Sequence, residues 1–188
     1  MAECQLCGNT DAYIHFGTEL LCLDCFNEKM VKKLGVRVTS YPEGVMIRDG
    51  QGKVHRLRLR KRLDPIGFIM EAKAEETDGY EFVVHGALDV DQEELFLQLI
   101  AKAERGMAEL YVDQGHFPNG QSYNTMKNDR LAGRIAYDPD EDVVPKLVVD
   151  GKSYTWNEIG KMLMAYEGFQ IKLETLDSSD EIKWQDKR

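Results

Sequence analysis

Four cysteines near the start of the chain have the residue type and the spacing needed to bind a metal ion. Cys4 and Cys7 form one pair, fourteen residues intervene, and Cys22 and Cys25 form the second pair. Two residues between the members of a pair let both sulfurs reach one ion, while the intervening backbone amides point toward the thiolates. Four thiolates make a closed tetrahedral site without an open position for a substrate. The pattern therefore predicts one structural zinc ion as the cofactor.

Two other chemistries share these ligands. An iron–sulfur cluster also takes four cysteines, and a redox-active pair also has two residues between its thiols. A redox pair generally needs only one such motif inside a βαβ unit, and disulfide frameworks belong to secreted chains and spread across the fold. The chain has only four cysteines and all lie within its first 25 residues. Zinc is therefore the preferred metal, with iron–sulfur and redox chemistry as alternatives.

Short elements around the cysteines are expected to position the sulfurs. Residues 12–16 alternate as a strand, residues 17–19 supply a turn, and residues 20–22 return. Residues 26–34 have the pattern of a helix that Gly35 ends. A knuckle, a hairpin and a helix with the last two ligands at its start give the order of a treble-clef finger, and a zinc ribbon is the alternative. Zinc should supply the folding free energy of so short a segment.

The composition is that of a folded globular chain, with 43% hydrophobic and 30% charged residues. A net charge of -9 at pH 7 argues against a protein that coats nucleic acid non-specifically. The sequence has no stretch near the ~18 uninterrupted apolar residues of a membrane span, and its start lacks the pattern of a signal peptide. We therefore expect a cytoplasmic protein without a membrane partner.

The remaining residues predict an α+β fold. A meander of four antiparallel strands is expected from Val45 to Val84, and one apolar stripe marks a helix from Asp89 to Val112. Asp150-Gly151 signals a type I′ turn in a later hairpin. Thr155 and Glu158 then form a capping box that opens a second helix, and residues 169–173 alternate as a final strand.

These elements divide the chain into three parts. The expected parts are a four-cysteine finger at 1–39, an α+β domain at 40–176 and a charged tail at 177–188. In this arrangement an antiparallel sheet carries two packed helices and follows the treble-clef or zinc-ribbon module.

A basic run on the second strand of the meander is a candidate binding surface. Alternate residues of a strand share a face, so four arginines line one side while Leu57 and Leu59 point inward. Their guanidinium groups could bind phosphates or an acidic partner. The ordinary alternative is a solvated face paired with Glu71 and Glu75 of the next strand. The candidate anion-binding or partner-binding residues are Arg56, Arg58, Arg60 and Arg62.

Residues 113–133 are polar and rich in Asn, Gly and Asp, and they predict a long loop. Loops of that length are generally functional or mobile, and His116 in it is the one histidine worth testing in a catalytic role. Known catalytic motifs are missing, since there is no nucleophile elbow and no cysteine outside the two pairs. An acidic turn at 138–142 also fails the calcium-loop pattern, because Val143 stands where a glycine is needed.

Several segments carry a family resemblance. They are the two cysteine pairs, Tyr-Pro-Glu-Gly at 41–44, Asp-Gly-Lys-Ser-Tyr-Thr-Trp at 150–156 and Tyr-Glu-Gly-Phe-Gln-Ile-Lys-Leu-Glu at 166–174. Together they resemble an uncharacterised family of bacterial proteins, a domain of unknown function with an N-terminal four-cysteine zinc finger. The resemblance covers most of the chain. It implies a bacterial cytoplasmic zinc protein and no particular activity, substrate or partner.

The preferred function is a non-enzymatic interaction or regulatory protein, whose finger presents a surface to a protein partner. One alternative is a nucleic-acid-associated factor that uses the Arg56–Arg62 strand, and another is an enzyme built around residues 113–133. A zinc or redox sensor is a further alternative. Nucleic acid is less favoured, because the basic strand carries no aromatic residue that could stack on bases. The sequence does not specify the oligomeric state.

Overall fold

The N-terminal finger has the predicted order of a hairpin followed by a helix. In the computed structural model, which describes residues 2–141 and 143–184, the hairpin consists of β1 (Ile14–Phe16) and β2 (Glu19–Leu21). Helix α1 (Leu23–Leu34) follows, and it begins before the predicted Phe26 because Cys22 is its N-cap. Gly35 ends α1 in the left-handed conformation with φ of 69°, as expected just past a helix.

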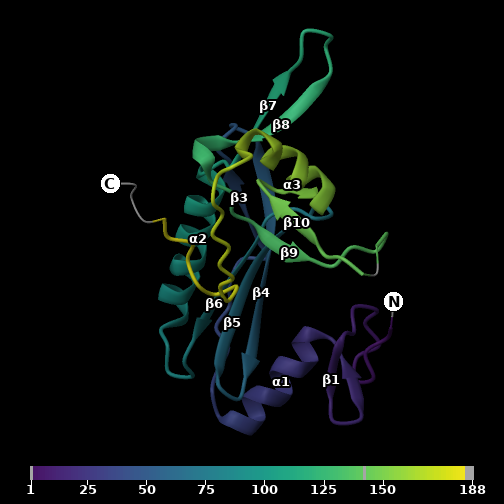
Figure 1. Ribbon diagram of the computed structural model, residues 1–188. Coiled ribbons are helices and arrows are strands. Elements are labelled where there is room, and N and C mark those ends of the chain that lie inside the picture. The colour runs from purple at the N-terminus through teal and green to yellow at the C-terminus, as the bar shows by residue number, and fades with distance from the viewer. Residues whose placement is uncertain (1, 142, 185–188) are drawn as a thin grey trace.

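One antiparallel sheet dominates the middle of the chain, and it confirms the predicted meander. Its strands pair in chain order, and α2 (Gln92–Ala108) packs on one of its faces (Figure 1). The helix is shorter than the predicted Asp89–Val112. It starts at Gln92 because the Asp91 carboxylate accepts the N–H groups of Glu93 and Glu94, and Glu109 is already extended. The strands are β3 (Gly44–Arg48), β4 (Val54–Asp64), β5 (Gly67–Ala74) and β6 (Glu81–Gly86).

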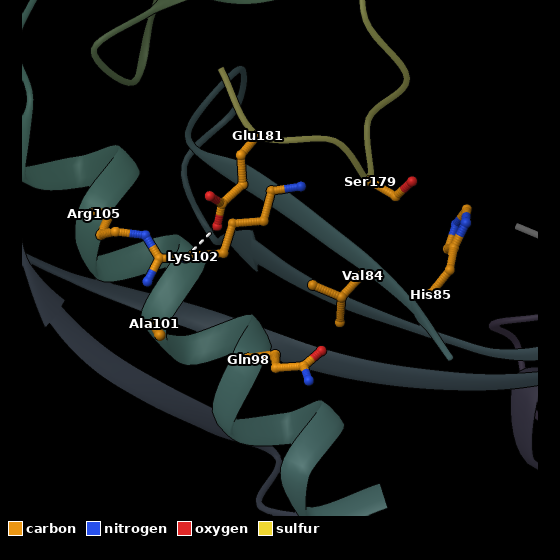
Figure 2. A pocket seen from close by; sticks show the side chains of 8 residues that line it. All are labelled: Val84, His85, Gln98, Ala101, Lys102, Arg105, Ser179 and Glu181. Atoms are coloured by element: carbon orange, nitrogen blue, oxygen red, sulfur yellow. Dashed lines mark hydrogen bonds and ion pairs between the residues drawn. The ribbon is translucent and has the colours of Figure 1, made fainter. Parts of the chain in front are cut away.

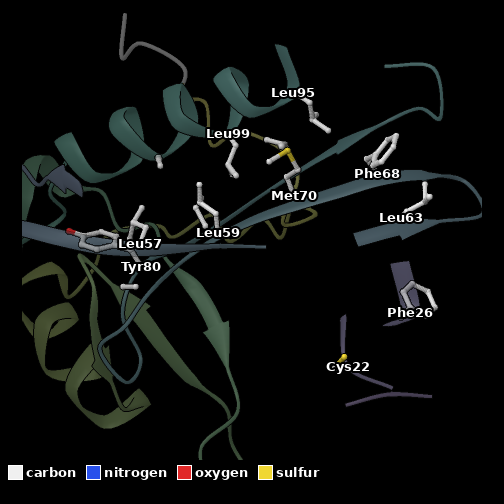
Figure 3. Packing of buried hydrophobic residues seen from close by; sticks show 14 of the residues in the cluster. Cys22, Phe26, Leu57, Leu59, Leu63, Phe68, Met70, Tyr80, Leu95 and Leu99 are labelled. Carbon is white, nitrogen blue, oxygen red and sulfur yellow. The ribbon is translucent and has the colours of Figure 1, made fainter. Parts of the chain in front are cut away.

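The main hydrophobic core lies between α2 and this sheet (Figure 3). Leu95 and Leu99 point from the helix toward Leu59 of β4 and Met70 of β5, and all four are buried. The same core continues into the finger, where its buried residues are Cys4, Ala12, Leu21, Cys22, Phe26 and Met30. The finger and the sheet therefore share one core.

A second hydrophobic cluster lies in the C-terminal third. Helix α3 (Trp156–Leu163) contributes Ile159 and Met162, which pack with Tyr111, Val149 and Tyr154. The prediction that both helices pack on the main sheet was wrong, because α3 buries its apolar face in this separate cluster. The other elements here are β7 (Val112–His116), β8 (Ser122–Met126), the 3-10 turn η1 (Lys127–Asp129), β9 (Arg134–Ala136), β10 (Lys146–Val149), β11 (Lys152–Tyr154) and the 3-10 turn η2 (Met164–Tyr166).

The predicted turn chemistry of this region is confirmed. Strands β10 and β11 form the hairpin, and Asp150 and Gly151 both have positive φ, 51° and 70°, as a type I′ turn requires. The Asp150 carboxylate also accepts the N–H groups of Tyr111 and Val112, at 2.9 and 2.8 Å. Thr155 and Glu158 form the capping box of α3.

Two predictions for this region were wrong. Residues 113–133 are not a long loop, since β7 and β8 form a hairpin that projects from the end of the molecule opposite the finger (Figure 1). Its strands are mostly polar, with the apolar pair Val112 and Met126 only at the base, so the sequence shows no apolar alternation here. Residues 169–173 do alternate between apolar and polar side chains. They nevertheless form no strand, because no other strand of the described chain pairs with them. No helix among the described residues has the length and apolar character to cross a membrane.

The finger joins the sheet by completing an exposed strand edge. Strand β3 pairs only with residues 54–58 of β4, so the same edge of β4 is uncovered farther along. Asn27 of α1 fills it, because its side chain accepts the Leu63 N–H at 2.9 Å and donates to the Lys61 carbonyl at 2.8 Å. An asparagine thus replaces a neighbouring strand. The remaining bonds on this edge are Leu59 N–H to the Glu43 carbonyl at 2.8 Å and Lys61 N–H to the Tyr41 hydroxyl at 3.1 Å.

Lys61 is a buried ammonium group at the same junction. Its residue is 1% exposed, and Nζ donates to the Thr39 carbonyl, the Thr39 hydroxyl and Gln92 Oε1 at 3.0–3.2 Å. The Tyr41 ring lies beside it, 4.9 Å from Nζ to the ring centroid. These contacts involve three segments: the connection after the finger, β4 and the start of α2. Burial lowers the pKa of Lys61.

Asn27→Ala should loosen the finger from the sheet. The substitution leaves a partly buried N–H and a carbonyl of β4 without partners, at an expected cost of about 1–3 kcal/mol of unfolding free energy. Glu28→Ala, at the exposed next position of α1, is the control and should change stability by less than ~0.5 kcal/mol. Urea denaturation measures both. Equal stability of the two variants would contradict the strand-edge role.

The contribution of Lys61 should depend on pH. Its folded pKa lies below the unfolded value of about 10.4, so between the two pKa values the unfolded chain binds more protons and stability rises with pH. The stability difference between the unsubstituted protein and Lys61→Met should therefore shift in favour of lysine as pH rises toward 10. Urea midpoints measured from neutral to alkaline pH test this. A difference that stays constant would show that the pKa is not lowered.

Candidate metal centre

The fold brings the sulfur atoms of Cys4, Cys7, Cys22 and Cys25 together, all within 4.8 Å of one another. The Cys7 and Cys22 sulfurs are 3.7 Å apart. Metal–sulfur bonds of about 2.3 Å in a tetrahedron place the sulfurs about 3.8 Å from each other. The donor set therefore fits a metal ion bound by four sulfurs. It is the one group of three or more potential ligands with this proximity in the described part of the chain.

Two local structures hold the ligands. The first pair lies on a tight turn, in which the Gly8 N–H donates to the Cys4 carbonyl at 2.8 Å. Gly8 has φ of 75°, a conformation that favours glycine, directly after Cys7. The second pair lies at the start of α1, where Cys22 is the N-cap and Cys25 is in the first turn. The positive end of the helix dipole there favours thiolates.

Gln5 ties the turn to the hairpin. Its backbone N–H donates to the Leu20 carbonyl at 3.0 Å, and its side chain accepts the Leu20 N–H at 2.9 Å. This reciprocal pair fixes the distance between the first two cysteines and the strand that leads to the others. The amide of Gln5 is thus a positioning group for the cluster.

The electrostatics of the cluster suit a cation. Burial raises the pKa of the Cys4 thiol, but the backbone amides of Cys22, Cys7 and Leu6 outweigh it and lower that pKa to about 6. Burial and the sulfurs around it raise the pKa of Cys25. Four thiolates this close repel one another, and a divalent cation bound to them offsets the repulsion and lets all four ionise.

Access to the cluster is uneven. Cys4 and Cys22 are buried, Cys25 is partly buried and Cys7 is exposed. Four cysteine ligands fill every position of a tetrahedral ion, so a metal ion held here would have no coordination site left for a substrate.

Most of the predicted arginine face is paired with carboxylates of this chain. Arg56 lies 3.5 Å from Glu75, and Arg60 lies opposite Glu71 in the register of β4 and β5. Both contacts are those expected if the arginine face is solvated and pairs with the next strand. Arg60 also lies 3.6 Å from Asp11 in the finger, and Arg62 lies 2.9 Å from Asp64. Arg58 lines a shallow cavity of about 200 Å³ with Glu43, Arg56 and Glu75. The face therefore carries nearby carboxylates of its own that compete with an external anion.

A larger cavity, of about 370 Å³, lies between β6, α2 and the C-terminal segment (Figure 2). None of its lining residues belongs to residues 113–133. Arg105 pairs with Glu181 across it, and Lys102 donates to the carbonyls of Val83 and Ser178 at 2.9 and 2.8 Å. These contacts within the chain already engage both cations. The lining residues are Val84, His85, Gln98, Ala101, Lys102, Arg105, Ser179 and Glu181.

The sequence reasoning missed two buried polar groups on β4. His55 is 6% exposed, with Nε2 2.8 Å from Asp49 and Nδ1 3.3 Å from Glu76. The contact with His55 and backbone N–H groups of the turn lower the pKa of Asp49 against the effect of burial. Lys61 is the other missed group. Strand periodicity could have found both, because they share the inward parity of Leu57 and Leu59.

Three family models match the chain, and each describes a domain of unknown function. Residues 3–37 match DUF7685, residues 39–108 match DUF7686 and residues 111–180 match DUF7713. No curated protein and no solved structure matched the chain. The first match spans the cysteine cluster, the second the main sheet with α2, and the third the smaller cluster around α3. The chain is thus similar to families of uncharacterised proteins along nearly its whole length.

Proposed function

We propose that Cys4, Cys7, Cys22 and Cys25 hold one structural zinc ion, and that the protein is a non-enzymatic interaction or regulatory module. The observation that carries the proposal is the proximity of the four sulfurs, all within 4.8 Å of one another. A set of four cysteines favours zinc among the common divalent cations. The zinc ion when bound supplies a fixed tetrahedral crosslink rather than a reactive group.

The order of elements supports a treble-clef finger over a zinc ribbon. A glycine turn carries the first pair, the β1–β2 hairpin follows, and the second pair lies at the start of α1. A ribbon would present the second pair on another turn instead of a helix. The helix also bears Asn27, so the metal-bound end of α1 and its contact with β4 belong to one rigid element.

The position of the finger supports the proposed binding role. It occupies one end of the molecule, and the β7–β8 hairpin projects at the other (Figure 1). Leu6 and Tyr13 are exposed on the finger, at 52% and 45%. Exposed apolar groups on a metal-braced surface suit a protein partner. We retain a cytoplasmic bacterial protein as the setting for this role.

Elemental analysis of protein purified without chelator should find one zinc ion per chain. Cys25→Ser should lower the zinc content to less than half, because serine is a poor zinc ligand. His15→Ala is the matched control, since His15 is exposed in the β1–β2 hairpin between the two cysteine pairs and does not belong to the cysteine cluster, and it should retain full zinc.

Three results would overturn the zinc proposal. Iron with visible absorption would identify a cluster, and metal-free protein with a folded finger would make redox chemistry at the thiols the better account. Zinc that persists in Cys25→Ser at the level of the unsubstituted protein would place the ion elsewhere.

A further inference from the structure

The segment after η2 has no helix or strand from residue 169 to residue 177. Every residue from 167 to 178 is exposed. Its apolar side chains are large, and Phe169, Ile171 and Leu173 are each at least 75% exposed. Apolar residues scattered singly over a surface are ordinary, but a run of them in one segment marks an interaction site.

The segment has the chemistry of a strand without a partner. Phe169, Ile171 and Leu173 alternate with Gln170, Lys172 and Glu174, so an extended backbone puts the apolar set on one face and the polar set on the other. Within the described ranges, no backbone hydrogen bond involves residues 170–176. Unpaired N–H and carbonyl groups beside an apolar face form a template for pairing with another chain.

Contacts near both ends hold this stretch in place. Before it, the Tyr166 hydroxyl donates to Asp129 at 3.0 Å, and the Phe169 ring packs edge-on against Tyr166. After it, Lys102 of α2 donates to the Ser178 carbonyl, and Arg105 pairs with Glu181 (Figure 2). A strand anchored on both sides loses less conformational freedom when it pairs, which favours binding.

The charged side chains of the segment in one copy are complementary to those of the same segment in a second copy. In an antiparallel pair centred on Leu173, Lys172 of one copy lies opposite Glu174 of the other, and the two-fold axis repeats this ion pair. Within one chain these two side chains are already 3.0 Å apart, both largely exposed. The same register places Leu173 against Leu173 and keeps Ile171 on the shared apolar face.

We propose that residues 170–176 are a dimerisation strand, which pairs antiparallel with the same segment of a second copy about Leu173. The pairing would satisfy the backbone groups along one edge of each strand and bring the apolar side chains of the two copies together on one face, with Leu173 against Leu173. This inference does not depend on the metal, because the segment lies in the C-terminal third and, among the residues that the structure describes, contributes none to the core that the finger shares with the main sheet.

Sedimentation equilibrium of the full chain, over micromolar to millimolar concentrations, should give a monomer–dimer equilibrium. Leu173→Ser should weaken the dimer by about tenfold or more, because it removes the central apolar contact. Leu97→Ser is the matched control, since Leu97 on α2 is also exposed, at 58%, and lies outside the segment. It should leave the dimer unchanged.

The register has its own test. Lys172→Glu alone places glutamates opposite glutamates, and Glu174→Lys alone places lysines opposite lysines, so each variant should be largely monomeric. An equimolar mixture should recover the dimer, because each variant supplies the charge that the other lacks. Pairing within one chain cannot produce this recovery. Circular dichroism of each variant checks that the fold is unchanged.

Three outcomes would overturn the proposal. A chain that stays monomeric throughout the range has another use for the segment, such as a different protein partner. A dimer that Leu173→Ser leaves intact forms through another surface. A mixture of the two charge variants that remains monomeric contradicts the register about Leu173.

Discussion

The uncovered edge of β4 is the constraint on which the rest of the structure depends. Strand β4 has eleven residues, but β3 covers only its first part, so the backbone groups beyond residue 58 need other partners. Asn27, Tyr41 and Glu43 supply them. Each comes from the finger or from the connection that follows it. Hydrogen bonding to this edge therefore positions the finger. The finger in turn covers an edge that could otherwise pair with another chain.

This arrangement couples the cysteine cluster to the main core. Leu21, Cys22 and Phe26 belong to the same hydrophobic cluster as the residues under α2. A metal ion bound at the start of α1 would therefore also fix Asn27, two residues after Cys25, at the edge of β4. Lys61 adds a polar contact at the same junction, with three acceptors in place of a counter-ion. The finger acts as part of the fold rather than as an appendage.

The sequence predicted best what local chemistry decides. Cysteine spacing, Asp150-Gly151 and the Thr155–Glu158 box each specify a short structure, and the finger hairpin, the meander and α2 followed from apolar patterns.

The wrong predictions concern contacts between segments far apart in the sequence. The β7–β8 hairpin has polar strands, so no alternation reveals it, and residues 169–173 alternate yet find no strand beside them. The placement of α3 depends on a second cluster that only tertiary packing creates. The burial of His55 and Lys61 was not predicted. Their polar side chains suggested exposure, although their positions in the strand alternation placed them on the inward face.

Amide hydrogen exchange on the metal-loaded protein and on the chelated protein tests the coupling between the cysteine cluster and the sheet most directly. The account predicts that chelation removes protection from α1 and, with it, from the Leu63 amide, whose acceptor is Asn27. The amides that join β5 to β6 should keep their protection, because their partners lie within the sheet. If Leu63 stays protected while α1 exchanges freely, the finger does not complete the edge of β4, and the central claim is wrong.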